Sequence, residues 1–307
     1  MENKMNKIRS FIIVIAIALL VSGCSSVKPD VGQVVFASPD EATSSLKDAV
    51  KKNDTKRLME ILGPQGKDIV FSSDERFDAE ARGWFTKKAD EKTEIVKLED
   101  ACFIHLGNDK WPFLVPIAQY GGKYFFHTSA GLDEMLNRRI GKNELNAIRV
   151  CNTLVAAEED YAKMKLAAGA VKEYAAKLFS DKGKNNGLYW DSDDAKDKSP
   201  IGALIVLASQ ESPEPARRPY YGYFYKILDS QGPAAPGGAK SYLAAGKMVN
   251  GFAFAAYPAS YGVSGIKTFI VSKNGVVFEK DLGTDTAKKA SAMTQFNPDD
   301  TWTPVRD

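Results

Sequence analysis

The sequence predicts an α+β protein built from two domains, and three observations carry this prediction. A chain of 307 residues is longer than one hydrophobic core usually serves. A hydrophobic content of 44% is enough for folded structure throughout. Capped helical patterns and short β-rich runs alternate twice along the chain. We therefore expect N-terminal helices with a curved antiparallel sheet over residues 36–141, and a long helix with a small antiparallel sheet over residues 142–307.

The first residues have the order of an export signal. Lys4, Lys7 and Arg9 precede an apolar run from Phe11 to Val21. This run is too short for a transmembrane helix, which needs about 20 apolar residues. Two small residues then precede Cys24, and this ending resembles the lipobox of bacterial lipoproteins. Residues 1–23 are therefore predicted to be a lipoprotein signal peptide.

Cys24 is the residue that this signal predicts as the lipid attachment site. Residues 24–35 then form a tether to the folded domains. Serine rather than Asp follows the cysteine, and this resembles an outer-membrane address facing the periplasm if the host is Gram-negative. The expected partners are thus the membrane, through the N-terminal lipid, and an envelope protein.

The charge of the mature chain argues against nucleic acid as a partner. Residues 1–23 contain three of the 41 basic residues and one of the 39 acidic residues, so 38 of each sign remain. A formally neutral chain has no global positive field that would attract phosphates. The chain also lacks the spacing of a phosphate-binding loop, and we expect no cofactor.

Helix signals open the N-terminal domain. Ser38 to Glu41 is a capping box with Pro39 at the first helical position. Asp54 caps a second helix that Gly63 and Pro64 end, and a third helix is predicted over residues 74–89.

Four β-rich runs complete the N-terminal domain. They cover residues 94–98, 101–106, 111–120 and 123–128. Pro112 and Pro116 predict that the third run is bent or at a sheet edge, because proline cannot donate to the ladder. Helices followed by a curved antiparallel sheet resemble the cone-shaped, nuclear-transport-factor-like (NTF2-like) fold.

The C-terminal domain is predicted to begin after Gly141. A closing helix over residues 131–140 precedes this glycine, and helices over residues 143–164 and 170–179 follow it. Strands are predicted over residues 220–228, 251–257, 266–272 and 276–280. Asn274 and Gly275 join the last two as a hairpin turn. A long helix before a small antiparallel sheet resembles the globular part of type IV pilins and pseudopilins, although the leader is of lipoprotein type.

Several longer motifs together resemble one bacterial family. They are Phe36–Ala42, Ile61–Pro64, Trp111–Phe113, Leu136–Gly141, Gly187–Trp190, Gln231–Gly238 and Ala256–Ala259. The family is domain of unknown function 2950, and the resemblance spans Phe36 to Trp302. It implies an envelope protein of unassigned activity. Tyr221 stands where the resemblance implies a histidine.

Two histidines are the only candidates for acid–base chemistry at neutral pH. A satisfied sheet histidine is one interpretation of each. In the other interpretation, both histidines line a pocket in the concave face of the sheet, together with aromatic side chains and one carboxylate. The residues of this pocket would be His105, His127, Trp84, Trp111 and either Asp133 or Glu134. Nucleophile motifs of hydrolases are absent. We therefore expect a non-enzymatic binding or interaction protein. The alternative is a small-ligand-binding or enzymatic N-terminal cone that uses His105, His127 and Asp133.

A cluster of tyrosines is the other candidate binding surface. In strand geometry, Tyr221, Tyr223 and Tyr225 would face the same way. An exposed tyrosine face suits recognition of a partner or a glycan. Burial of these rings against the mid-chain helix is the alternative interpretation.

An acidic loop and two cysteines leave further alternatives open. Asp191, Asp193 and Asp194 could hold calcium, although the glycine and terminal Glu of an EF-hand loop are missing, so a solvated acidic loop is the alternative. Cys102 and Cys151 could form a disulfide in an oxidising compartment, or remain two buried thiols.

Overall fold

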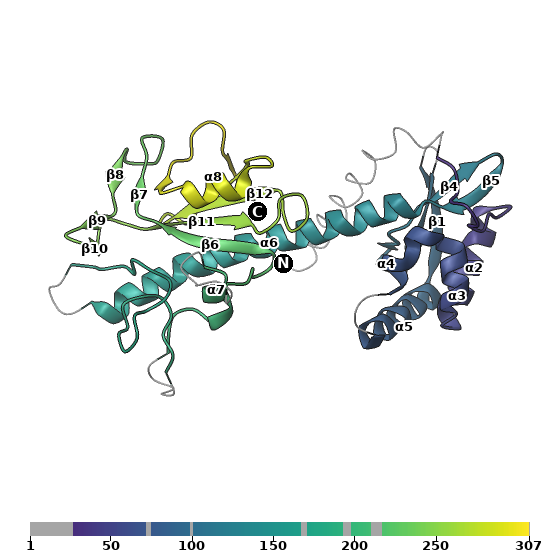
Figure 1. Cartoon of the computed structure of the whole chain (residues 1–307), viewed down its shortest axis with the longest axis horizontal. Helices are drawn as coiled ribbons and strands as arrows, with labels where there is room; N and C mark the ends of the chain where they lie inside the picture. The colour runs from purple at the N-terminus through teal and green to yellow at the C-terminus, as the bar shows by residue number, and fades with distance from the viewer. Residues whose placement is uncertain are drawn as a thin grey trace. The chain divides into compact units, whose positions relative to one another are not determined.

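The chain folds as an α+β protein, as predicted, and divides into two compact units between Asn137 and Arg138 (Figure 1). The computed structural model describes residues 27–71, 75–98, 101–166, 171–192, 198–209 and 217–306. The predicted signal peptide and Cys24 lie outside these residues. Within them, no helix is both long enough and apolar enough to cross a bilayer.

Helices cover one face of the sheet in the first unit (Figure 1). They are α2 (Pro39–Lys51), α3 (Thr55–Leu62), η2 (Pro64–Gly66), α4 (Lys67–Val70) and α5 (Glu75–Glu91). The predicted cap at Ser38 is confirmed, because its hydroxyl accepts the N–H of Glu41 at 3.1 Å. Asp54 caps α3 in the same way, through the N–H of Arg57 at 2.9 Å. Both caps satisfy an N–H group that a helix start would leave unpaired.

The sheet of the first unit is antiparallel throughout. Its strands are β1 (Thr93–Leu98), β2 (Ala101–Leu106), β3 (Trp111–Pro112), β4 (Ile117–Tyr120) and β5 (Lys123–Phe126). The order is β1-β2-β4-β5, and β3 also pairs with β2. The single run predicted over residues 111–120 is therefore two strands separated by residues 113–116. The bend that its two prolines predict is the reason, since Pro112 ends β3 and Pro116 precedes β4.

One continuous helix, α6 (Thr128–Lys165), replaces the two helices predicted on either side of Gly141. Gly141 lies inside α6, where a Cβ atom would meet no other atom within 4 Å. Glycine within a helix costs about 1 kcal/mol relative to alanine, which weakens a helix without ending it. Reading Gly141 as a helix break was therefore wrong.

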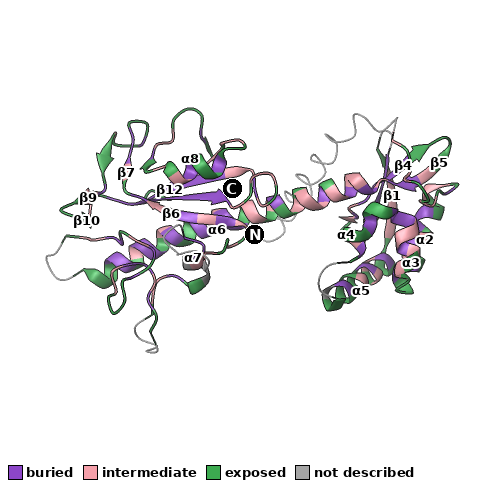
Figure 2. Cartoon of the chain, in the orientation of Figure 1, coloured by how far each residue is buried: buried purple, intermediate pink, exposed green. Residues whose placement is uncertain are grey.

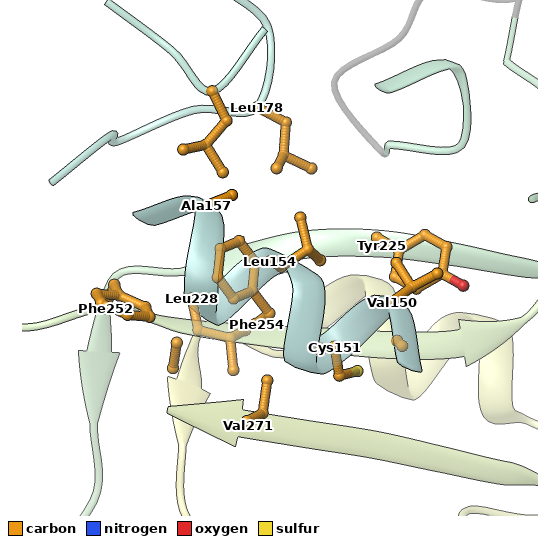
Figure 3. Close-up of a cluster of buried hydrophobic side chains, with 14 of the residues drawn as sticks. Val150, Cys151, Leu154, Ala157, Leu178, Tyr225, Leu228, Phe252, Phe254 and Val271 are labelled. Carbon is orange, nitrogen blue, oxygen red and sulfur yellow. The ribbon is translucent and has the colours of Figure 1, made fainter. Parts of the chain in front are cut away.

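The second half of α6 packs on the main sheet of the second unit (Figure 3). The strands of this sheet, in spatial order, are β15 (Thr303–Pro304), β13 (Val277–Asp281), β12 (Lys267–Ser272), β11 (Ala253–Pro258) and β6 (Tyr223–Leu228), all antiparallel. Cys151 and Leu154 of α6 are fully buried in this contact. All six residues of β11 are buried (Figure 2), and α8 (Thr286–Ala292) also packs against this strand. The hydrophobic core of the unit therefore lies around β11.

Short elements surround this core. They are α7 (Ala203–Leu207), β7 (Ser230–Gln231), β8 (Lys240–Ser241), β9 (Leu243–Ala244), β10 (Lys247–Met248) and β14 (Gln295–Phe296). The order β14-β7-β8 forms a small sheet, and β9 pairs with β10. The hairpin predicted after β12 is present, but only Gly275 has a positive φ, at 75°.

The helix predicted over residues 170–179 is wrong, since its described part, residues 171–179, contains no helix. The backbone there has other partners. Tyr174 donates its N–H to the carbonyl of Met248 at 2.8 Å, and Ala175 donates its N–H to the side chain of Glu158 at 2.8 Å. Tertiary hydrogen bonds therefore replace the helical ones.

Glu158 on α6 is a fully buried carboxyl group. Its Oε2 accepts the N–H of Ala175, whereas its Oε1 has no hydrogen-bond partner. Burial raises the pKa of Glu158 well above the ordinary value of 4.5, and the hydrogen bond from Ala175 only partly opposes this. Below that ordinary pKa the group is neutral in the folded and unfolded states alike. As the pH rises above it, the folded state loses stability, until the pH passes the raised pKa.

We expect Glu158→Gln, which imitates the neutral acid, to match the wild type near about pH 4 and to become more stable than the wild type as the pH rises. The gain should be about 1.4 kcal/mol for each unit by which the folded pKa exceeds the ordinary one. Urea unfolding at a series of pH values measures it. Glu159→Gln is the control, because Glu159 pairs with Lys172 and its loss should bring no gain. A constant difference between Glu158→Gln and wild type at every pH would contradict the prediction.

Candidate functional site

His105 lies on β2, where it pairs with Glu94 of β1 and Pro112 of β3. The side chain is half-buried. Burial lowers the pKa of His105 below 6.5, and the negative charge of Glu94 partly opposes this lowering. The imidazole is therefore neutral at pH 7.

His127 lies between β5 and α6 and has a different electrostatic environment. Burial lowers its pKa, and the charge of the exposed Asp133 on α6 opposes the lowering. The N–H of His127 donates to Pro116 at 2.8 Å. This places His127 two strands away from β2, so the Cα atoms of the two histidines are roughly 12 Å apart at ordinary strand spacings. The structure brings His127 towards Asp133 but does not join His105 to them.

The interior of the first unit is filled by its own side chains. Phe113 makes edge-to-face contacts with Phe85 at 5.5 Å and with Phe126 at 6.4 Å between ring centroids. Phe36 also packs on Phe126, at 6.3 Å. All four rings belong to the buried cluster between the helices and the sheet. Aromatic packing thus occupies the space between these layers.

Trp84 and Trp111, which the sequence suggested as binding residues, form one aromatic pair. Their ring centroids are 4.8 Å apart, with an angle of 83° between the ring planes. Trp84 comes from α5 and Trp111 from β3. Trp84 keeps 41% of its surface exposed, whereas Trp111 is half-buried. The pair therefore presents a large apolar side chain to solvent.

An ion pair holds the two segments that carry the tryptophans. Lys88 lies one turn after Trp84 on α5, and its Nζ is 3.0 Å from Oδ1 of Asp109, in the turn before Trp111. This hydrogen bond is the main reason why the pKa of Lys88 is raised. Gly107 in the same turn has φ 72°, and a Cβ there would lie 2.6 Å from Asp109. Gly107-Asn108-Asp109 marks the turn in the sequence, but no local pattern predicts its contact with α5.

The three tyrosines predicted to share a face do not form an exposed surface. Tyr223 and Tyr225 are fully buried on β6. The hydroxyl of Tyr223 donates to the carbonyl of Lys267 at 2.8 Å, and burial raises the pKa of both phenols. Tyr221 is 44% exposed, because it lies in a turn before β6 rather than in the strand. Of the three, Tyr221 alone can contact a partner.

The cysteines and the acidic loop add no site among the described residues. Cys102 and Cys151 are buried free thiols with no bridge between them. Burial raises the pKa of Cys151 to about 12, so its thiol is unreactive at neutral pH. Asp191 accepts the hydroxyl hydrogen bond of Tyr189, while Asp193 and Asp194 lie outside the described residues. Within the described ranges, no three potential ligands gather as a metal site would require.

Comparison with known proteins identifies a family. The profile of the family described as protein of unknown function (DUF2950) matches residues 33–305. The chain belongs to this family. No curated protein and no solved structure matches the chain. The resemblances to NTF2-like and pilin-like folds therefore stay predictions.

One motif of the DUF2950 resemblance, Gln231–Gly238, is a structural loop. The buried Gln231 donates from Nε2 to the carbonyls of Pro236 at 2.9 Å and Gly238 at 2.6 Å. Its Oε1 accepts the hydroxyl of Tyr242 at 3.1 Å. Each hydrogen-bonding atom of this amide thus has a partner within the unit.

We expect Gln231→Ala to lower the free energy of unfolding by about 1–3 kcal/mol, because it leaves buried polar groups unpaired. Thermal unfolding followed by circular dichroism measures the change. Gln295→Ala, at an exposed glutamine on β14, is the control and should change stability little. Equal stability of the two variants would show that the loop does not depend on Gln231.

Proposed function

We propose that this DUF2950 protein is a lipid-anchored binding protein of the bacterial cell envelope, and that it contacts an envelope partner through Trp84 and Trp111. The edge-to-face packing of Trp111 on Trp84, which is 41% exposed, is the observation that carries the proposal. Removing a tryptophan surface from water on binding is favourable, and tryptophan is enriched among residues that dominate binding energy.

The surroundings of the pair resemble the polar rim of a protein interface. Lys88 and Asp109 form an ion pair beside the rings. Lys110, directly before Trp111, is exposed, and its Nζ lies 3.9 Å from Oε2 of Glu94. Interfaces commonly combine buried aromatic residues with charged groups at the edge. These charges can set the orientation of a partner while the rings supply most of the affinity.

The anchor is proposed from the leader. Basic residues, an eleven-residue apolar run and two small residues precede Cys24 in the order of a lipoprotein signal. The mature protein is then held at the membrane by lipid on Cys24, and faces the periplasm from the outer membrane in a Gram-negative host. The predicted tether of residues 24–35 is shorter in this proposal and ends before Asp30, because Gln33 donates from Nε2 to the carbonyls of Ile61 at 2.9 Å and Phe126 at 2.8 Å and so belongs to the first unit.

An acid–base function of the first unit has less support. It would need His105, His127 and Asp133 in one site, whereas different charges act on the two imidazoles. The space between helices and sheet, where such a site would lie, is packed with phenylalanine rings. A binding role requires neither condition.

We expect metabolic labelling with radioactive palmitate to label the wild-type protein and not Cys24→Ala, because that variant removes the thiol that the lipid would modify. Cys102→Ala is the control. Its cysteine is buried in the fold, so its labelling should equal that of the wild type. Label that persists in Cys24→Ala would remove the anchor from the proposal.

We expect Trp84→Ala to abolish a discrete adduct that amine-reactive crosslinking of intact cells produces with the wild type, since Lys88 and Lys110 flank the pair. Truncating a residue that dominates an interface costs about 2 kcal/mol or more, which weakens binding more than tenfold. Immunoblots of the crosslinked envelopes measure the adduct.

Tyr120→Ala is the matched control for this experiment. Tyr120 lies in the same unit and is 40% exposed, against 41% for Trp84, so it removes a similar aromatic surface elsewhere. The adduct should persist in this variant. Absence of a reproducible wild-type adduct, or its equal loss in both variants, would contradict binding through Trp84.

A further inference from the structure

A two-residue hairpin turn precedes β6 in the second unit. Tyr220 donates its N–H to the carbonyl of Tyr223 at 3.0 Å, and Tyr223 returns a hydrogen bond to Tyr220 at 3.1 Å. The two residues between them have positive φ, 51° for Tyr221 and 74° for Gly222. Such turns strongly prefer Asn-Gly, Asp-Gly or Gly-Gly, because a positive φ brings the Cβ atom of other residues close to the backbone.

Tyrosine at position 221 lowers the stability of the folded state. A bulky residue with positive φ costs stability that asparagine or glycine would avoid. Its ring contacts Tyr220 at 4.3 Å between centroids, and a side-chain hydrogen bond with Tyr221 raises the pKa of Tyr220. However, 44% of Tyr221 remains exposed, so burial does not explain the choice. Strain of this kind in an exposed side chain points to an external contact.

Two exposed basic residues lie near the hairpin. Arg218 is exposed three residues before Tyr221. Lys142 is also exposed and precedes Asn143, whose amide would lie 2.6 Å from a Cβ at Gly222.

The acidic groups on the neighbouring elements already have partners. Glu144 accepts the N–H groups of Ile266 and Lys267 at 2.9 Å and 3.0 Å. Asp281 accepts the hydroxyl of Tyr261 at 3.2 Å. These hydrogen bonds fix the positions of both carboxylates on the fold. Among the described residues, no ion pair joins either carboxylate to Arg218 or Lys142, so these two cations can pair with a negatively charged ligand.

We propose that the hairpin at Tyr220 and Tyr221 binds an acidic glycan chain. The exposed ring of Tyr221 packs on the apolar face of a sugar, and Arg218 and Lys142 pair with its carboxylates. The proposal goes beyond the proposed function, which concerns Trp84 and Trp111 in the other unit. It depends neither on that pair nor on the lipid.

The composition of the surface favours a glycan over a membrane. Membrane-binding surfaces combine basic residues with several large apolar side chains that enter the lipid. Here the exposed apolar surface comes from Tyr221 and from Val263, 48% exposed on the neighbouring loop. One ring and one small aliphatic side chain suit a pyranose, which presents a small apolar face among hydroxyl groups.

The test uses the full chain in detergent and its sedimentation with purified peptidoglycan sacculi, which carry carboxylates along a glycan. We expect the wild type to pellet and Tyr221→Asn to pellet at least tenfold less. At the same time, Tyr221→Asn should raise the melting temperature, since asparagine accepts the positive φ. Phe179→Asn is the matched control, because Phe179 is 44% exposed in the same unit. This variant should pellet as the wild type does.

Competition with soluble oligosaccharides and binding to phospholipid vesicles distinguish glycan binding from membrane binding. Soluble oligogalacturonate should release the protein from sacculi, and neutral chitohexaose should release it less. The proposal is overturned if the wild type does not pellet, if Tyr221→Asn is stabilised yet still pellets, or if both variants lose binding equally. Binding to vesicles of anionic phospholipid that exceeds binding to sacculi overturns it in favour of a membrane surface. Failure of the Trp84→Ala prediction would leave each of these outcomes unchanged.

Discussion

The packing of the apolar stripe of α6 against the sheet around β11 is the interaction on which the second unit depends. Both faces of β11 are covered, so each of its residues must be apolar. Three of them are the small residues Ala253, Ala255 and Ala256, which let the covering elements approach closely. The hydroxyl of Tyr223 enters this layer with a partner, since it donates to Lys267. Oε1 of Glu158 and the hydroxyls of Tyr174 and Thr268, which are also buried in this unit, have no hydrogen-bond partner.

Sequence motifs correctly predicted the helix starts that are fixed by hydrogen bonds between residues close in the sequence. Ser38 and Asp54 cap helices because their side chains accept N–H groups three residues later. The errors arose where distant residues decide the structure. Nothing near Gly141 reveals that its position in a helix is open, and nothing near Ala175 reveals that its N–H bonds to Glu158, 17 residues earlier. Periodicity describes one segment, whereas these contacts join two.

Residue type predicted the candidate surface only in part. The sequence singled out aromatic residues by type alone, and type does not separate Trp84, which is exposed, from Tyr223, which is buried. Alternation placed Tyr221 and Tyr223 on one face, which would hold only if the strand had begun before Tyr221. The hairpin instead uses Tyr221 and Gly222 as its turn, and so turns Tyr221 to solvent. The pairing of Trp84 with Trp111 and the contact of Lys88 with Asp109 join the same two segments, which are distant in the sequence.

Four non-glycine residues of the described chain have a positive φ, namely Asn53, Lys110, Tyr221 and Ala245, and Tyr221 alone among them is aromatic. Asn53 has φ 54°, which costs little because asparagine tolerates this conformation. Tyr221 has nearly the same φ, and a left-handed backbone costs about 1–2 kcal/mol in an ordinary residue. Within a core, such a cost can be offset by burying the side chain, but 44% of Tyr221 stays exposed. Packing of its ring on Tyr220 offsets part of this cost, and the proposed contact outside the chain would account for the rest.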